Sequence, residues 1–425
     1  MRVPRVFRWA IVSLVMFMLC APSRVFAQAP VTPQAQALND ARAEVDRLKQ
    51  ELAAMRELYD KRLADLEGRL TALAVPAAPP APAPEPPSTA ASSAAAAGSS
   101  KVFNPDISVI ANFVGVAGKN DNSTQPALNL SEVETSFQAV IDPYARGDFF
   151  LSAGPDGLEV EEGFVTFNTL PAGLLLKAGK MRAQFGKVNT LHTHALPYAD
   201  RPLVTQNLVG GEGGISESGF SLSRLIQNSA IFLEATGEAY YGHSEVFESS
   251  DRSKLTYVGR LRGYRDITEG TNLDVGGSYA YGPSAHPEGA VALDSSTELF
   301  GFDATFRYRP LRRAIYKRFQ ARTELVWSRP HVGSQVQAAS FGYYGNVEYQ
   351  FARRWFAGAR YDRSAHPLEP SLVDTGGSFF LTYWPSEFSQ VRGQYRRTNY
   401  GDGVRANEFL FQLNFAIGAH GAHVF

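Results

Sequence analysis

The chain has 425 residues, 44% of them hydrophobic, so neither length nor composition limits the size of a core. Its formal net charge of −1 lacks the basic excess expected of a nucleic-acid-binding protein, so we expect no nucleic-acid partner. The single cysteine, Cys20, lies in the N-terminal leader, so the mature protein is expected to have neither disulfides nor thiol chemistry.

Residues 1–27 are predicted to be a secretory signal peptide. Arginines near the start precede an apolar run from Trp9 to Leu19, and small residues lead to a cleavage site after Ala27. The apolar run is too short to cross a membrane as a helix. Since Leu19 is a poor residue before a lipid-modified cysteine, we prefer this interpretation to a lipoprotein signal.

Residues 35–74 are predicted to form a periplasmic coiled coil. Apolar residues recur at alternating spacings of three and four, with one stutter, at Val45, Leu48, Leu52, Met55, Tyr59, Leu63, Leu66, Leu70 and Leu73. A single amphipathic helix packed on a neighbouring domain would show the same pattern, but the uninterrupted seam favours self-association. Residues 75–100, rich in proline, alanine and serine, are predicted to be a linker, extended in its first half and flexible in its second.

Residues 101–425 are predicted to form an all-β, antiparallel outer-membrane barrel of about sixteen strands. In the last strand one face carries aromatic and aliphatic side chains and the other carries Glu408, Gln412 and Asn414. The same alternation continues through the preceding residues, which favours a lipid-facing barrel over a soluble β-sandwich. The terminal aromatic residue, Phe425, is expected to be recognised by the barrel-assembly machinery.

The connections between the predicted strands are alternately short turns and longer polar loops. This alternation is expected if both ends of the barrel domain face the periplasm. The predicted loops include Lys119–Leu128, Tyr241–Ser253, Pro283–Ser296, Pro330–Ala339 and Ser364–Asp374. The predicted strands are Pro105–Ala117, Asn129–Asp142, Ala145–Gly154, Leu158–Thr169, Ala172–Arg182, Ile215–Leu222, Ser229–Tyr240, Lys254–Arg265, Thr271–Gly282, Thr297–Tyr308, Arg318–Ser328, Ser340–Phe351, Arg354–Arg363, Thr375–Trp384, Phe388–Asn399 and Arg405–Gly418.

Positions that alternate with the aromatic ones are predicted to face the lumen and to line a pore. They carry both charges and are Arg260, Arg262, Arg307, Arg322, Arg360, Arg392, Arg396, Glu132, Glu134, Asp303 and Glu324. A barrel of about sixteen strands leaves room for an aqueous channel. An arginine-rich wall opposite a glutamate-bearing wall would favour anions near the arginines. Alternatively, several of these charges only pair with one another.

The connection from Ala183 to Gly214 has no strand pattern and is long enough to suggest a function. Its apolar anchors indicate a folded loop, which we expect to enter the barrel as a constriction formed by Phe185, His192, His194, Tyr198, Asp200 and Arg201. His192 and His194 could bind a metal if a carboxylate such as Asp200 or Glu212 approaches, although hydrogen-bonding histidines are commoner. No metalloprotease or nucleophile-elbow motif occurs, so we expect no enzyme and no cofactor.

Several motifs carry a family resemblance: Lys180–Gly186, His192–Pro197, Asp200–Pro202, Tyr383–Phe388 and Gly418–His423. In these stretches the chain resembles the phosphate-selective-porin-like superfamily, which has coiled-coil-bearing trimeric members, and within it the branch labelled zinc-regulated outer-membrane proteins. That branch is also labelled a TonB-dependent receptor. Such a receptor would need a plug domain and about twenty-two strands, neither of which this chain offers.

These patterns predict a porin-like channel in the outer membrane, a homotrimer surrounded by lipid, for passive diffusion of small polar or anionic solutes. Two alternatives remain open. One is an envelope tether with a closed barrel, and the other is a receptor for a metal or metal complex.

Overall fold

The computed structural model describes residues 105–155, 157–228, 230–284, 295–333 and 335–418, together with Gln50. The chain divides into two units, and all of these residues except Gln50 belong to the second, Ala97–Phe425. The predicted signal peptide, coiled coil and linker, and the terminal Phe425, lie outside the described residues, apart from Gln50 in the coiled coil. Among the residues described, no helix is long and apolar enough to cross a bilayer.

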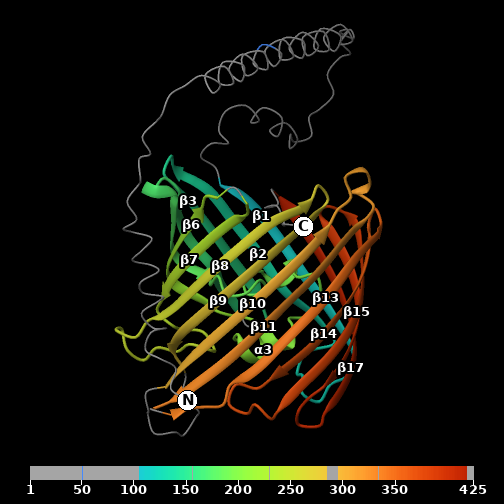
Figure 1. Ribbon diagram of the computed structural model, residues 1–425. Coiled ribbons are helices and arrows are strands. Elements are labelled where there is room, and N and C mark those ends of the chain that lie inside the picture. The colour runs from blue at the N-terminus through green and yellow to red at the C-terminus, as the bar shows by residue number, and fades with distance from the viewer. Residues whose placement is uncertain are drawn as a thin grey trace, which may run out of the picture. The chain divides into compact units, whose positions relative to one another are not determined.

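One antiparallel sheet closes on itself to form a barrel (Figure 1). Of its 17 strands, β12 (Gln335–Val336) only extends the hairpin after β11, so sixteen strands build the wall. Each wall strand pairs with its sequence neighbours, and β1 pairs with both β2 and β17, which leaves no free edge. The wall strands are β1 Asp106–Lys119, β2 Leu128–Asp142, β3 Ala145–Gly154, β4 Gly157–Phe167, β5 Leu174–Arg182, β6 Ser216–Ile226, β7 Phe232–Tyr240, β8 Thr256–Thr268, β9 Thr271–Pro283, β10 Ser295–Tyr308, β11 Arg318–Val332, β13 Ser340–Ala352, β14 Trp355–Ala365, β15 Val373–Ser386, β16 Ser389–Asn399 and β17 Arg405–Gly418.

All sixteen predicted strands are present, and β3 and β17 have the predicted ends. The predicted loop Pro330–Ala339 is wrong at its start, because β11 continues past Pro330 and turns back as β12. Proline is tolerated there because pairing with β13 stops at Ser328, so the missing N–H breaks no bond to that strand. The predicted loop Ser364–Asp374 is also too long, since β14 reaches Ala365 and β15 begins at Val373.

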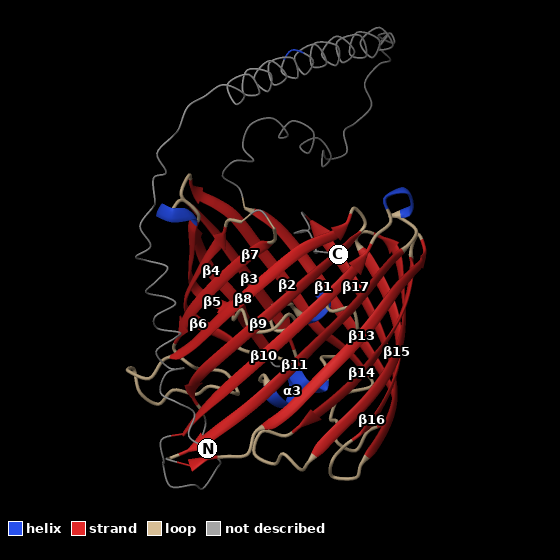
Figure 2. Ribbon diagram, viewed as in Figure 1, coloured by secondary structure: helices blue, strands red, loops and turns tan. Residues whose placement is uncertain are grey.

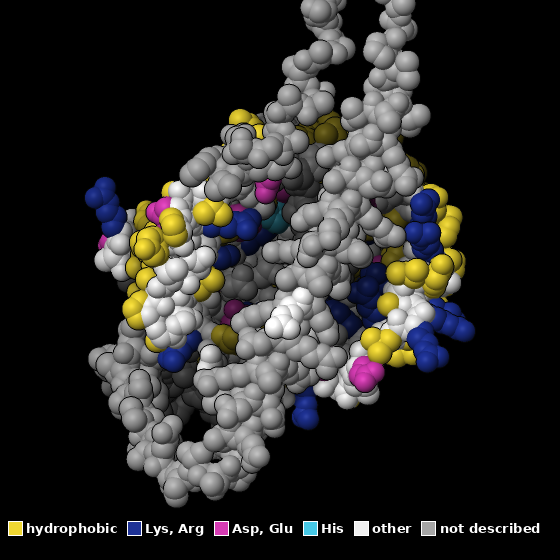
Figure 3. Space-filling view, turned by 90° about the horizontal axis from the view of Figure 1, so that it is seen from above, with side chains coloured by type: hydrophobic (Ala, Val, Ile, Leu, Met, Phe, Trp, Pro, Cys, Tyr) yellow, Lys and Arg dark blue, Asp and Glu magenta, His cyan; other side chains and the backbone are white. Residues whose placement is uncertain are grey.

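The two faces of the wall differ as the alternation predicts. On β17, Phe411 is 38% exposed on the outer face, whereas the adjacent Gln412 is fully buried inside the barrel. Seen from above, hydrophobic side chains gather on the outer side of the wall, and charged side chains lie both on its inner side and at the rim (Figure 3). An apolar outer face and a polar inner face are typical of a barrel embedded in lipid.

Apolar residues also gather inside the barrel, which the alternation did not predict. The connection Ala183–Gly214 contains η2 (Thr193–Ala195) and the short helix α3 (Leu203–Leu208), and α3 contacts β11, β13, β14 and β15 within the ring of strands (Figure 2). Its buried apolar residues pack against inward-facing residues of the wall in one cluster that includes Phe185, Val188, Leu196, Tyr198, Val204, Leu208, Val258, Leu299, Val326, Tyr344 and Phe380. The connection and the inner face of the wall therefore share one hydrophobic core.

Candidate functional site

Both ends of the connection are fixed by side chains near its base. The Asn189 amide donates to the carbonyl groups of Ala183 (2.9 Å) and Ile215 (3.0 Å) and accepts from the Ile215 N–H (2.8 Å). The Arg182 guanidinium donates to the Gly213 carbonyl at 2.9 Å. These bonds draw the two ends of a long connection together, so that its middle projects as one folded body.

Polar groups of the wall hold this body from all sides. Wall carboxylates accept from its backbone amides: Glu238 from Gln184, Glu324 from Lys187 and Val188, and Asp362 from Leu203 at the start of α3. Counting all hydrogen bonds, the connection bonds to eleven of the sixteen wall strands, namely β2, β4, β5, β7, β8, β9, β11, β14, β15, β16 and β17. It therefore lies across the lumen.

Asp200 is the most strongly held side chain of the connection. Its Oδ2 accepts from Arg360 Nη2 at 2.8 Å and from Arg396 Nη1 at 2.9 Å, and its Oδ1 accepts from the Gln394 amide. The Arg360 guanidinium also lies over the Tyr198 ring, 4.3 Å from the centroid. Burial by itself would raise the pKa of Asp200, but the two arginines hold that pKa well below its usual value. The carboxylate is thus an anion locked between two cations.

A basic cluster, defined here as Lys187, Arg262, Arg307 and Arg322, forms where the connection meets strands β8, β10 and β11. Asp274 accepts from Arg262 at 2.8 Å and lies 3.7 Å from Arg307. The Nε and Nη1 atoms of Arg322 have no hydrogen-bond partner among the described residues. Burial, aided by repulsion from the three arginines and opposed by Asp274, lowers the pKa of Lys187 to about 8. Three of these cations therefore share the anion Asp274, while Glu234 lies 3.8 Å from Arg262 and Glu324 and Glu348 act on Arg322.

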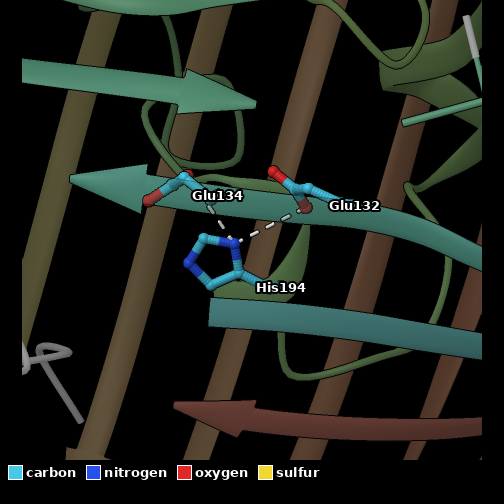
Figure 4. A group of neighbouring side chains, drawn as sticks. All are labelled: Glu132, Glu134 and His194. Carbon is cyan, nitrogen blue, oxygen red and sulfur yellow. Dashed lines mark ion pairs between the residues drawn. The ribbon is translucent and has the colours of Figure 1, made fainter. Parts of the chain in front are cut away.

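A histidine–carboxylate cluster lies on the opposite side of the barrel, as β2 and β10 are eight strands apart around the ring. It comprises Glu132 and Glu134 of β2, Glu161 and Glu162 of β4, and His192 and His194 of the connection. The two ring nitrogens of His192 contact Glu134 (2.5 Å) and Glu162 (2.8 Å). The Nδ1 of His194 lies 3.6 Å from Glu132 and 3.8 Å from Glu134 (Figure 4).

Local backbone geometry explains how four carboxylates meet there. Glu132 and Glu134 are two residues apart on β2 and so share one face. In β4 the register shifts, because Phe150 pairs with Glu162 and Leu151 pairs with Val160, leaving Glu161 as an extra residue. Such a bulge re-aims side chains, and both Glu161 and Glu162 reach His192. Burial by itself would lower the pKa of His192. Glu134, Glu161 and Glu162 outweigh burial and raise this pKa well above its usual value.

The structure places all eleven predicted pore-lining residues on the inner face. Eight are buried, whereas Arg262, Arg307 and Arg396 are half-buried. Most are paired: Arg260 with Asp303, Arg262 with Asp274, Arg360 with Asp200 and Asp362, and Arg396 with Asp200 and Glu408. Arg392 instead donates to the neutral Thr382 and Gln412.

The six predicted constriction residues all lie in the connection, where all but the half-buried His192 are buried. The carboxylates named as possible partners of the histidines are wrong, because Asp200 binds arginines and the carboxylates that reach the histidines come from β2 and β4. Sequence reasoning also missed Lys187, Asp274, Glu161 and Glu162. Asp274 alternates with apolar neighbours and could have been found, whereas simple alternation assigns adjacent glutamates to opposite faces.

Comparison with known proteins gives one clear relative. No protein-family model matches the chain. An uncharacterized protein of Aquifex aeolicus (strain VF5) is 30% identical over 386 residues, covering 77% of this chain and 81% of that protein. The chain belongs to the same family as this Aquifex protein.

Solved structures share the fold of this chain. OprB of Pseudomonas putida matches with a TM-score of 0.54 at 10% identity, covering 75% of this chain and 94% of that chain. An anion-selective porin from Comamonas acidovorans matches with a TM-score of 0.52 at 10% identity, covering 74% and 99%. OmpT of Vibrio cholerae matches with a TM-score of 0.51 at 10% identity, covering 75% and 100%. The fold is that of outer-membrane porins, while the resemblance to the zinc-regulated branch stays a prediction.

Proposed function

We propose that the chain is an outer-membrane, porin-like channel through which small polar or anionic solutes diffuse passively, with Ala183–Gly214 as its constriction. The number of wall strands supports a channel, since about sixteen strands enclose a lumen wide enough for water. The bonds from the connection to eleven wall strands support a constriction at a fixed place. The proposal gives no residue a catalytic role and requires no cofactor.

The basic cluster is the observation that supports small anions as the solute class. Lys187, Arg262 and Arg307 share the anion Asp274, and Arg322 keeps two guanidinium nitrogens without a hydrogen-bond partner in the described part of the chain. Fixed cations beside a narrow aqueous path raise the local concentration of anions, and salt screens this effect over about 10 Å at 0.1 M. Small anions are therefore the favoured solutes.

Reversal potentials in planar bilayers test the proposal. The variant Lys187→Gln/Arg307→Gln/Arg322→Gln should shift selectivity toward cations in dilute KCl, with the shift fading as salt is raised. Arg312→Gln/Arg313→Gln/Arg353→Gln is the matched control, since these side chains are exposed in the connections between strands. An unchanged reversal potential in the first variant would contradict anion selection by the basic cluster.

An envelope tether with a closed barrel is the second candidate, favoured by the apolar core that the connection forms with the wall. The two functions differ in conductance. Folded, bilayer-inserted protein that shows no current at any voltage would favour the tether, whereas stable open-channel steps favour the channel.

We further propose a homotrimer in the outer membrane, with the predicted coiled coil and linker in the periplasm and Phe425 recognised during barrel assembly. The heptad seam supports self-association. OmpT of Vibrio cholerae, whose barrel this chain resembles, has been solved in a trimer form.

A further inference from the structure

We propose that Glu132, Glu134 and His194 form a binding site for a divalent transition-metal cation of the Zn²⁺ type, which fastens the connection Ala183–Gly214 to β2. The three side chains converge from two segments far apart in the sequence (Figure 4). Binding at this site does not depend on the channel function proposed above.

The spacing of the ligand atoms fits a shared cation. One donor atom from each residue lies within 4.8 Å of the other two. The Nδ1 of His194 is 3.6 Å from Glu132 Oε2 and 3.8 Å from Glu134 Oε2, distances too long for hydrogen bonds. Two ligands at about 2.0–2.1 Å from a tetrahedral cation lie about 3.4 Å apart, so each carboxylate needs to move only a few tenths of an ångström relative to His194, and the two carboxylates lie within 4.8 Å of each other.

A buried oxygen points to a ligand at the same place. Glu132 is 8% exposed, and its Oε2 has no hydrogen-bond partner among the described residues. A carboxylate oxygen that is buried in this way is costly unless a donor or a cation satisfies it. This oxygen is the atom that faces His194.

The charge around the site also favours a cation. Four glutamates gather there, where Arg182 pairs with Glu161 and His192 contacts Glu134, Glu161 and Glu162, so negative charge still exceeds positive charge among these groups. A divalent cation would reduce the resulting negative excess in a buried setting, where it costs most. One imidazole with two carboxylates suits Zn²⁺ better than Ca²⁺ or Mg²⁺, which prefer oxygen ligands alone.

His192 is the positioning residue of this site. Its Nδ1 contacts Glu134 at 2.5 Å while its Nε2 contacts Glu162 of β4 at 2.8 Å, so it orients a ligand and ties it to a second strand. Partners of this kind typically change metal affinity 10–100-fold when they are removed. A bound cation would therefore link the connection to β2 directly and to β4 through His192.

Zinc titration of the full chain tests the site. Untagged protein in detergent, stripped with a chelator, is titrated with Zn²⁺ by calorimetry, and its metal content is measured after dialysis. All proteins carry His420→Ala and His423→Ala to remove two histidines near the C-terminus. We expect one Zn²⁺ per chain, and X-ray absorption should show nitrogen and oxygen ligands at about 2.0–2.1 Å.

Single substitutions assign the ligands. His194→Ala and the nearly isosteric Glu132→Gln should each weaken binding at least about 100-fold, and His192→Gln by about 10–100-fold. His331→Ala is the matched control, because His331 also faces a carboxylate, Glu298, at 3.5 Å, and should bind zinc like the parent. Heat-modified gel mobility verifies folding of each variant. The site is disproved if the parent binds no zinc at micromolar concentration, or if folded Glu132→Gln binds it unchanged.

Discussion

Lys187 is the residue whose charge should respond most to mild alkali. Its pKa of about 8, lowered by burial and by the neighbouring arginines, means that it is protonated at pH 6.5 and largely neutral at pH 9. Anion selectivity should therefore fall as the pH rises through about 8. Reversal potentials at the two pH values measure this change.

The change should be absent from Lys187→Gln and intact in Lys317→Gln, whose side chain is exposed at the turn after β10. A pH response that survives Lys187→Gln would assign the titration to another group. A response that is absent from the parent would mean that Lys187 does not face the ion path.

Asp200 carries the strongest polar anchor of the connection, so its charge should matter for stability. Asp200→Asn leaves Arg360 and Arg396 with one carboxylate each, Asp362 and Glu408. We expect a loss of about 3 kcal/mol in the free energy of unfolding, the lower end of the cost of breaking a buried ion pair. Thermal unfolding followed by gel mobility measures it, with the exposed Asp251→Asn as the control.

The same carboxylate sets a pH window. Because the folded-state pKa of Asp200 lies below its unfolded value of about 3.9, its contribution is present above that value and is lost as pH falls through the folded pKa. The stability difference between the parent and Asp200→Asn should be constant from pH 7 to pH 5 and should shrink below about pH 4. A difference that already shrinks near pH 6 would contradict this assignment.

At the scale of elements, Gly186 allows the connection to enter the lumen. Its φ of +61° is a left-handed conformation, and an added Cβ would lie 2.6 Å from Glu324 Oε2, the carboxylate that accepts from Lys187 and Val188. Gly186→Ala should therefore displace the start of the connection and cost about 1–3 kcal/mol of stability. Gly345→Ala in β13 is the matched control, since an added Cβ meets no atom within 4 Å there. Equal melting temperatures for the two variants would contradict the close approach.

A second test at this scale concerns which face of strand β3 meets the lipid. Phe149 is 48% exposed on the outer face, whereas Ser152 faces inward opposite Glu134 and Glu159. Phe149→Arg should cost about 2–4 kcal/mol near the bilayer midplane and block insertion, while Ser152→Arg should insert normally. Folding yield into lipid vesicles separates the two. Similar yields would mean that the faces of β3 are assigned the wrong way round.

At the scale of the whole molecule, assembly should depend on the segment before the barrel. We expect that deleting residues 35–74 leaves a folded barrel but weakens the trimer, because the heptad seam lies outside the barrel unit. Light scattering in detergent compares the mass with that of a variant lacking only residues 88–100 of the linker. An unchanged trimer mass after the first deletion would place the self-association in the barrel alone.

The sequence by itself determined the wall. Strict alternation over short segments, interrupted by turn residues, identified all sixteen strands, since a strand exposes its two faces to lipid and to the lumen with a fixed period of two. It also identified Ala183–Gly214 as the unusual connection, because nothing in that stretch repeats. The same period of two predicted that the eleven charged residues face inward.

Only the tertiary structure decided what those charges do. Asp200 meets Arg360 and Arg396 across about 160 and 196 residues of chain, and no local pattern relates them. The apolar cluster inside the barrel arises because the connection folds back onto residues such as Leu299 and Val326, and the bulge at Glu161 turns a side chain that alternation would place elsewhere. Periodicity specifies a face, whereas the partner on that face depends on how distant segments pack.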